Sequence, residues 1–235
     1  MEEFITKNFN FITYFVEVLA ATTGVLLHTR YKLTEAKYFI YYLVYIVLVE
    51  VLGSYSHYLN ELNLQSLLEG THFYDSVFWF TLFFDIGAIV FFSFYYYKIL
   101  KTRLFKSVLK YGTYLFLVAS IIDIMSNWQT FYDTFSSFIE ILGACLIILC
   151  ALFFFIELLQ SENVLNFKKN VNFYITVAIF IWWMVITPLV FYNTYHSEAD
   201  WDFVNLNRLI YLFANIFMYT TFTVGLIVSK PKNEQ

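Results

Sequence analysis

Five carboxyl side chains lie inside stretches of sequence that are otherwise apolar and aromatic. They are Glu17, Glu50, Asp85, Asp123 and Glu140. Asp85 illustrates the problem, since it stands in the middle of the run "FWFTLFFDIGAIVFFSFYYY". A charged side chain at the centre of a membrane helix costs about 2.5–3.5 kcal/mol on insertion scales. Acids at such positions therefore need a structural or a functional explanation.

No Lys or Arg lies at a comparable depth in these stretches, so ordinary ion pairs cannot neutralise the five acids. Three explanations stay open. The acids are protonated because burial disfavours the charged form, they line a wet cavity, or they surround a cationic ligand, an ion or a proton path. For any single acid there is also a structural alternative, in which the neutral group hydrogen-bonds to a carbonyl, Tyr, Thr, Ser or Asn nearby.

Five acids without one basic partner predict that at least two share a polar pocket in the outer half of a helical bundle. Three further residues are candidates for this pocket. Asn215 and Tyr219 lie on one face of the last apolar stretch, four residues apart. Trp183 belongs to a tryptophan pair that precedes Pro188, and such a pair either walls a pocket or simply packs. Together with the acids, these residues are the candidates for ligand or proton binding.

The elements that position these residues are membrane helices. The chain is 60% hydrophobic and only 14% charged, whereas a soluble domain carries about 25% charged residues. Apolar runs of spanning length fall at 9–27, 36–56, 73–97, 110–128, 135–157, 171–192 and 207–229. The sequence therefore predicts an all-α, polytopic bundle of seven transmembrane helices that forms a single domain over residues 1–235.

The basic residues between the spans predict the orientation of the bundle. Of the 14 Lys and Arg residues, all but Lys7 and Arg208 fall on one side, which leaves 14 − 2 = 12 there. By the positive-inside rule the N-terminus is outside and the C-terminus is cytoplasmic. The first residues, "MEEFITKNFN", are not a basic signal-peptide region, so we expect the first helix to be retained.

A weak internal repeat accompanies this topology. In two even-numbered spans a tyrosine precedes an acid by nine residues, Tyr41 before Glu50 and Tyr114 before Asp123. In three odd-numbered spans an acid is followed by small residues, as in "EVLAA", "DIGA" and "EILGA". The pattern favours three repeated hairpins plus one helix, and parallel repeats often frame a shared central site. Chance similarity is the alternative, since tyrosine and leucine are abundant here.

Several classes of protein lack support in the sequence. The four histidines have no metal-ligand spacing, residues 209–229 contain no lysine for a retinal, and there is no nucleotide-binding glycine loop. We therefore expect no metal, no cofactor, no catalytic residues and no nucleic acid partner. The basic connection "KILKTRLFKSVLK", from Lys98 to Lys110, fits contact with anionic lipid headgroups or docking of a cytoplasmic or membrane protein partner.

The stretches "TRYKLTEAKYFIYYLVYIVLVEVLGSY" and "LFANIFMYTTFTVGLIVSKPK" carry a resemblance. With them the chain resembles uncharacterised small bacterial seven-helix integral membrane proteins. These are similar in outline to the seven-transmembrane sensor regions that precede histidine kinases. The resemblance implies a multi-pass protein of the bacterial plasma (inner) membrane with a sensing role. Because Gln235 follows shortly after the last helix, output is expected through a partner protein or through the helices themselves.

Three functions follow from these observations. The first is a non-catalytic sensor or small-ligand-binding module with an acidic and aromatic pocket. The second is a proton- or cation-coupled carrier of small molecules, and the third is an accessory membrane subunit. A carrier should have broken helices at corresponding positions of its halves. Pro188 is the only proline within a span, which favours the sensor.

Overall fold

A computed structural model of the chain describes residues 8–64, 66, 68–161, 167–193 and 201–230. Helices account for 82% of this part, and none of it forms a strand, so the predicted all-α class is confirmed. Within these described residues, seven helical stretches are long and apolar enough to cross a bilayer. The chain is a multi-pass membrane protein.

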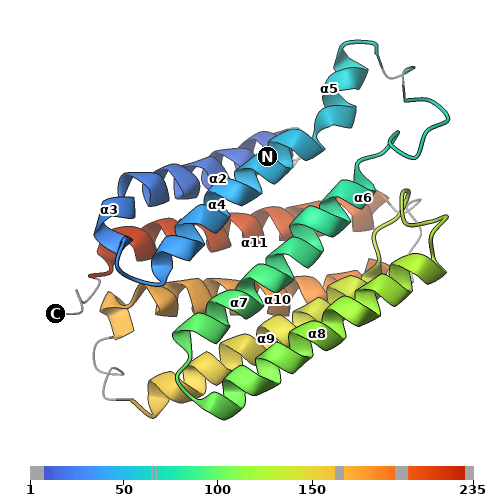
Figure 1. The fold of residues 1–235 in the computed structure, drawn as a ribbon. Coiled ribbons are helices and arrows are strands. Elements are labelled where there is room, and N and C mark those ends of the chain that lie inside the picture. The colour runs from blue at the N-terminus through green and yellow to red at the C-terminus, as the bar shows by residue number, and fades with distance from the viewer. Residues whose placement is uncertain (1–7, 65, 67, 162–166, 194–200, 231–235) are drawn as a thin grey trace.

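The helices follow one another as a series of antiparallel spans (Figure 1). In chain order they are α2 (Phe9–Leu26), α3 (His28–Tyr31), α4 (Ala36–Gly53), α5 (Tyr55–Glu61), α6 (Val77–Trp79), the π-helix η2 (Phe80–Ile86), α7 (Gly87–Ile99), α8 (Arg103–Ser126), α9 (Ser137–Leu159), α10 (Val171–Asn193) and α11 (Trp201–Val228). The second span joins α4 to α5, and the third joins α6, η2 and α7.

Two of the predicted spans begin too late. The fourth was expected from residue 110, but α8 starts at Arg103 and absorbs much of the basic connection. Its first turns are amphipathic: Leu109 is fully buried, and Phe105 stacks on Phe153 of α9 at a centroid distance of 4.2 Å. The seventh span was expected from residue 207, but α11 starts at Trp201. Polar residues at both starts concealed helical turns that lie beyond the apolar run.

Six of the spans pack side by side in a closed ring. The order around the ring is α2, α4, the η2–α7 segment, α9, α10 and α11, and α11 packs on α2 to complete it. Helix α8 lies outside this ring against α7 and α9 (Figure 1). The ring therefore brings the first and last spans together, although they are almost the whole chain apart in sequence.

The two ends of the bundle differ in their connections. One end, called the basic end below, carries α3, the turn from α7 to α8, the start of α10 and the end of α11 (Figure 1). Arg30 donates hydrogen bonds to the carbonyls of Ile227 and Ser229, and the Tyr31 hydroxyl donates to the Leu226 carbonyl at 2.8 Å. These bonds satisfy carbonyls at the end of α11. Which side of the membrane this end faces stays a prediction.

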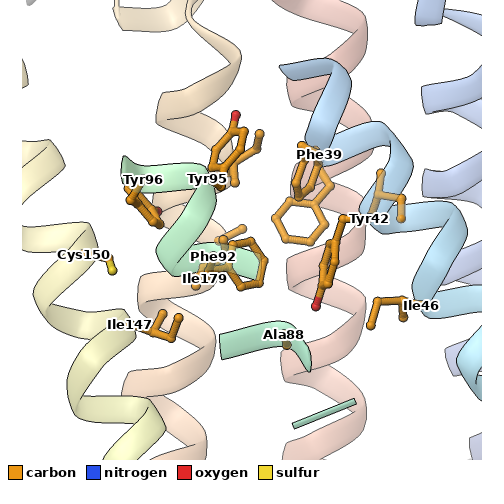
Figure 2. Close-up of a cluster of buried hydrophobic side chains, with 14 of the residues drawn as sticks. Phe39, Tyr42, Ile46, Ala88, Phe92, Tyr95, Tyr96, Ile147, Cys150 and Ile179 are labelled. Carbon is orange, nitrogen blue, oxygen red and sulfur yellow. The ribbon is translucent and has the colours of Figure 1, made fainter. Parts of the chain in front are cut away.

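Aromatic side chains fill the centre of the bundle toward the basic end (Figure 2). Phe39 and Tyr42 of α4 pack with Phe92 and Tyr95 of α7, with centroid distances of 5.0 Å for Tyr42–Phe92 and 6.1 Å for Phe39–Tyr95. The Tyr95 hydroxyl donates to Asn172 Oδ1 of α10 at 2.7 Å, which bridges the ring. Glu50 follows Phe39 and Tyr42 along α4, and Asp85 precedes Phe92 and Tyr95 in the third span. These acids therefore lie beyond the aromatic layer, toward the end of the bundle opposite the basic end, which is called the acidic end below.

Candidate functional site

Glu17 is the most deeply buried of the candidate acids, with 2% of its surface exposed. The buried face of α2 also contains Val16, Ala20, Ala21 and Gly24, which recur at helical spacing. Small residues on this face allow neighbouring helices to approach closely, and α2 packs on both α4 and α11. The sequence thus turns the Glu17 carboxyl inward, eight residues or roughly 12 Å from the start of α2.

The Glu17 carboxyl lies close to Glu50 of α4 and to Tyr219 of α11, with which it interacts electrostatically. Both neighbours are close enough to act on Glu17 as hydrogen-bond partners, although their orientations do not meet the geometry of a hydrogen bond. Within the described part of the chain, both Glu17 carboxyl oxygens and Glu50 Oε2 are buried without a hydrogen-bond partner. Buried polar atoms of this kind are rare in proteins and generally need a specific explanation. Here three unpartnered acceptor oxygens come from two adjacent side chains.

A cavity of about 140 Å³ adjoins these oxygens between α2 and the second span. Glu17, Glu50, Val18, Val47, Val51, Tyr14 and Tyr58 line it. A hydrogen bond of 3.2 Å joins the Tyr14 hydroxyl to Ser54 Oγ, and it links α2 to the end of α4 one turn nearer the acidic end than the two acids. The site therefore combines two carboxyls with two tyrosine rings and an apolar wall.

Asp85 lies in η2, a seven-residue π-helix in the middle of the third span. Such π-helical segments are rare and frequently occur at functional sites. The irregular turn is stabilised from α4, because the Tyr45 hydroxyl donates to the Phe83 carbonyl at 2.8 Å. Gly87 makes room for this bond, since a Cβ at its position would be 2.9 Å from the Tyr45 hydroxyl. The π-helix and the Tyr45 hydrogen bond that stabilises it therefore lie next to Asp85, the acid in the middle of the third span.

Asp85 and Glu140 of α9 are close enough to interact electrostatically. Both acids also interact electrostatically with Tyr211 of α11. Both acids are only partly buried. Neither carboxyl forms a hydrogen bond to another residue in the part of the chain that the structure describes. The bundle therefore holds two pairs of carboxyls, Glu17 with Glu50 and Asp85 with Glu140.

Two buried tyrosines lie beside the acid pairs, and one of them is a neighbour of both pairs. Tyr42 is an electrostatic neighbour of both Glu17 and Asp85, and Tyr219 is a neighbour of Glu17, Glu50 and Tyr42. In Figure 2 the Tyr42 ring lies below Phe39, and its hydroxyl points away from that ring. The two acid pairs are thus connected through tyrosine side chains at the centre of the ring.

Asp123 lies apart from both pairs, at the acidic end of α8. Its carboxylate accepts a hydrogen bond from the Ser136 hydroxyl at 2.6 Å and one from the Asn127 side-chain amide at 3.0 Å. Ser136 is the N-cap of α9 and accepts from the Ile139 backbone N–H at 3.3 Å. Asp123 therefore joins the end of α8 to the start of α9. It fits the structural explanation for a single acid, in which the carboxyl hydrogen-bonds to nearby polar side chains.

The remaining two candidates, Asn215 and Trp183, both contact Trp182 and do not contact the acids. Asn215 Oδ1 accepts a hydrogen bond from Trp182 Nε1 at 2.7 Å. Trp183 is buried in the main apolar core, in edge-to-face contact with Trp182 at 5.0 Å. These contacts join α10 to α11. Of the two candidates on α11, only Tyr219 reaches the carboxyls.

Sequence reasoning identified Tyr219 but missed three other tyrosines near the acids, which are Tyr42, Tyr45 and Tyr211. Tyr42 and Tyr45 are eight and five residues before Glu50 on α4, and these spacings place them roughly 80° and 140° around the helix from Glu50. Tyr211, Asn215 and Tyr219 recur every four residues along α11. The spacing of Tyr211 from the candidates Asn215 and Tyr219 would have identified it, since residues four apart share a helix face; Tyr42 and Tyr45 have no such signal.

No described Lys or Arg forms an ion pair with an acid. The one close contact between a basic and an acidic side chain in this part is exposed, and it joins His57 to Glu61 at 3.3 Å. In the same part of the chain, no three His, Cys, Asp or Glu side chains gather closely enough to hold a metal ion. The electrostatics of the site are therefore those of carboxyl and phenol groups alone.

No family model matches the chain, and no curated protein and no solved structure is significantly similar to it. The resemblance to the sensor regions of histidine kinases therefore stays a prediction. What the site can bind follows from its own geometry.

Proposed function

We propose that this protein is a non-catalytic, membrane-embedded sensor that binds a small organic cation between Glu17 and Glu50. One observation carries the proposal: the two carboxyls line the same cavity, and three of their oxygens lack a partner in the described part of the chain. The two carboxyls lie close enough to act on each other, but their orientation does not meet the geometry of a hydrogen bond, and three of the oxygens stay without a partner there. Buried acceptor oxygens without a partner are suited to a ligand that supplies donors and positive charge.

The size and lining of the cavity support an ammonium group on a short carbon chain. A cavity of about 150 Å³ accepts a benzene-sized molecule, and the cavity here is about 140 Å³. Tyr14 and Tyr58 contribute aromatic rings, which attract cations through their faces. Val18, Val47 and Val51 contribute an apolar wall. A primary alkylammonium ion with about five non-hydrogen atoms matches all of these features.

A route for the signal follows from α11. Tyr219 of α11 is an electrostatic neighbour of both Glu17 and Glu50. A ligand that binds these acids therefore changes the surroundings of Tyr219. The same helix ends at the basic end, where Arg30 and Tyr31 bind its last carbonyls. We propose that α11 carries the occupancy of the site to this end, where the basic turns of α8 from Arg103 onward meet a partner protein.

Thermal unfolding in lipid nanodiscs tests ligand binding. Butylammonium, tetramethylammonium and 1-butanol have equal numbers of non-hydrogen atoms, but only butylammonium has both charge and N–H donors. We expect butylammonium to stabilise the protein by about 2.7 kcal/mol at a hundredfold excess over its Kd. Tetramethylammonium should stabilise less, and 1-butanol not at all.

Matched variants decide whether the named acids are responsible. Glu17→Gln and Glu50→Gln should lose the response to butylammonium, whereas Asp123→Asn should keep it because Asp123 lies outside the cavity. An equal response of the wild type and Glu17→Gln would refute the proposed site. So would equal stabilisation by 1-butanol.

A proton-coupled carrier is the second candidate. It is favoured by the second pair, Asp85 with Glu140, and by the π-helix at Asp85. In this case Asp85→Asn should bind butylammonium normally and yet abolish its pH-driven uptake into proteoliposomes. Absence of uptake by the wild type would leave the sensor as the better account.

A further inference from the structure

The cavity at Glu17 and Glu50 opens sideways, through the outer surface of α2 and the second span. Val18 and Val51 line it, and in the isolated bundle they are 47% and 53% exposed. Both lie within membrane spans, so their exposed surfaces face acyl chains. The opening is therefore in contact with lipid, while Glu17 at the back of the cavity is almost fully buried.

A hydrogen bond crosses the end of the cavity that lies nearer the acidic end of the bundle. Tyr14 and Ser54 join α2 to the end of α4 through their hydroxyl groups at 3.2 Å, one turn nearer the acidic end than the acids. Tyr58, a further turn along the second span, lines the cavity on the same side. A ligand held at the carboxyls thus has tyrosines on the side nearer the acidic end and the gap between the two valines on its lipid side.

We propose that the ligand is an amphiphilic cation whose ammonium group binds Glu17 and Glu50 while its alkyl chain leaves the cavity sideways into the bilayer. This inference rests on the proposed function and names its ligand class. Charge complementarity selects the headgroup, because two acids without a basic partner form the floor. The apolar, lipid-facing mouth selects the chain, because a chain that stays among acyl chains keeps its favourable burial.

The chain-length dependence of binding tests where the alkyl chain lies. The probes are butyl-, octyl- and dodecylammonium in nanodiscs, with binding referred to the free aqueous concentration. If the chain remains in lipid in the bound state, the apparent Kd should fall about fourfold for each added methylene, which is the partition gain per CH₂. A constant or rising Kd would show that the bound chain leaves the bilayer, and it would overturn the inference.

Two matched valine variants test the position of the opening. Val51→Trp narrows the gap, whereas Val25→Trp alters a similarly exposed valine of α2 that is not part of the cavity, 55% exposed against 53%. We expect the Kd of octylammonium to rise at least tenfold in Val51→Trp and to change less than twofold in Val25→Trp. Equal effects of the two variants would overturn the lateral opening.

The outcomes separate this inference from the proposed function. If butylammonium binds in a Glu17-dependent manner but longer chains gain nothing, the site stands and the lateral chain is wrong. If no alkylammonium binds, the proposed function fails as well. If dodecanol binds as tightly as dodecylammonium and depends equally on Glu17, the cationic headgroup is wrong.

Discussion

Replacing Glu17 with methionine should stabilise the ligand-free protein. The side chain is 2% exposed, and neither carboxyl oxygen has a hydrogen-bond partner in the described part of the chain. Leaving a buried polar group unsatisfied costs about 1–3 kcal/mol. Methionine has a similar length and no strongly polar atom, and it adapts to irregular spaces. The substitution therefore removes the unfavourable group without leaving a large void.

The expected rise in melting temperature follows from this range. For chains of 150–250 residues, 1 kcal/mol corresponds to about 2–4 °C, so a gain of about 2 kcal/mol raises Tm by about 4–8 °C. Glu50→Met should give a smaller rise, because Glu50 has one unpartnered oxygen and is less buried. Both variants should lose the response to butylammonium. Each variant would then be more stable than the wild type but unable to bind the ligand, a trade-off that is common at functional sites.

The assay is thermal unfolding in nanodiscs without added ligand. Asp123→Leu is the control for removing an acid that has partners: it deletes the bonds from Ser136 and Asn127 and should lower Tm. A fall in Tm for Glu17→Met as large as that for Asp123→Leu would refute the reasoning. It would mean that the Glu17 carboxyl contributes favourable interactions to the ligand-free protein.

Three further predictions concern the fold. Gly87→Ala should lower stability by about 1–3 kcal/mol, because its Cβ would displace the Tyr45 hydroxyl from its carbonyl partner; in a Tyr45→Phe background its effect on Tm should be much smaller. Glu157→Ala should lower stability by about 0.5–2 kcal/mol in thermal unfolding, because Glu157 caps the backbone N–H groups before α8 at 2.7–3.1 Å. Single cysteines at Lys101 and Asp133, in a background without native cysteines, should react differently with a membrane-impermeant maleimide on intact cells. Only the cysteine at position 133 should be labelled, and the opposite result would reverse the predicted orientation.

The spans were predictable because their signal is local. A run of about 20 apolar residues crosses a bilayer wherever it occurs in the chain, so the sequence predicts each of the seven helices. Starts of helices were less predictable. The turns from Arg103 to Leu109 bury only one side, and their basic residues resemble a polar connection until α9 is seen to pack against them.

The partners of each acid were not predictable from spacing, because they depend on the rotation and neighbours of each helix. Glu17 faces inward with Ala20 and Ala21, and the ring then brings it to Glu50. Asp123 occupies a similar apolar run, but Ser136 lies across the next turn and engages it. The π-helix at Asp85 has no sequence signature in this chain, and its Phe83 carbonyl is bound by Tyr45 from another span.

A double-mutant cycle on butylammonium binding tests most directly whether Glu17 and Glu50 form one site. Calorimetric titration of the wild type, Glu17→Gln, Glu50→Gln and the double variant supplies the four affinities. Neighbouring residues that bind one ligand are coupled by about 0.5–3 kcal/mol. We predict that each single variant weakens binding at least tenfold, and that the double variant loses clearly less than the product of the two. Strictly multiplicative losses, or a double variant that binds butylammonium as tightly as the wild type, would contradict a shared site.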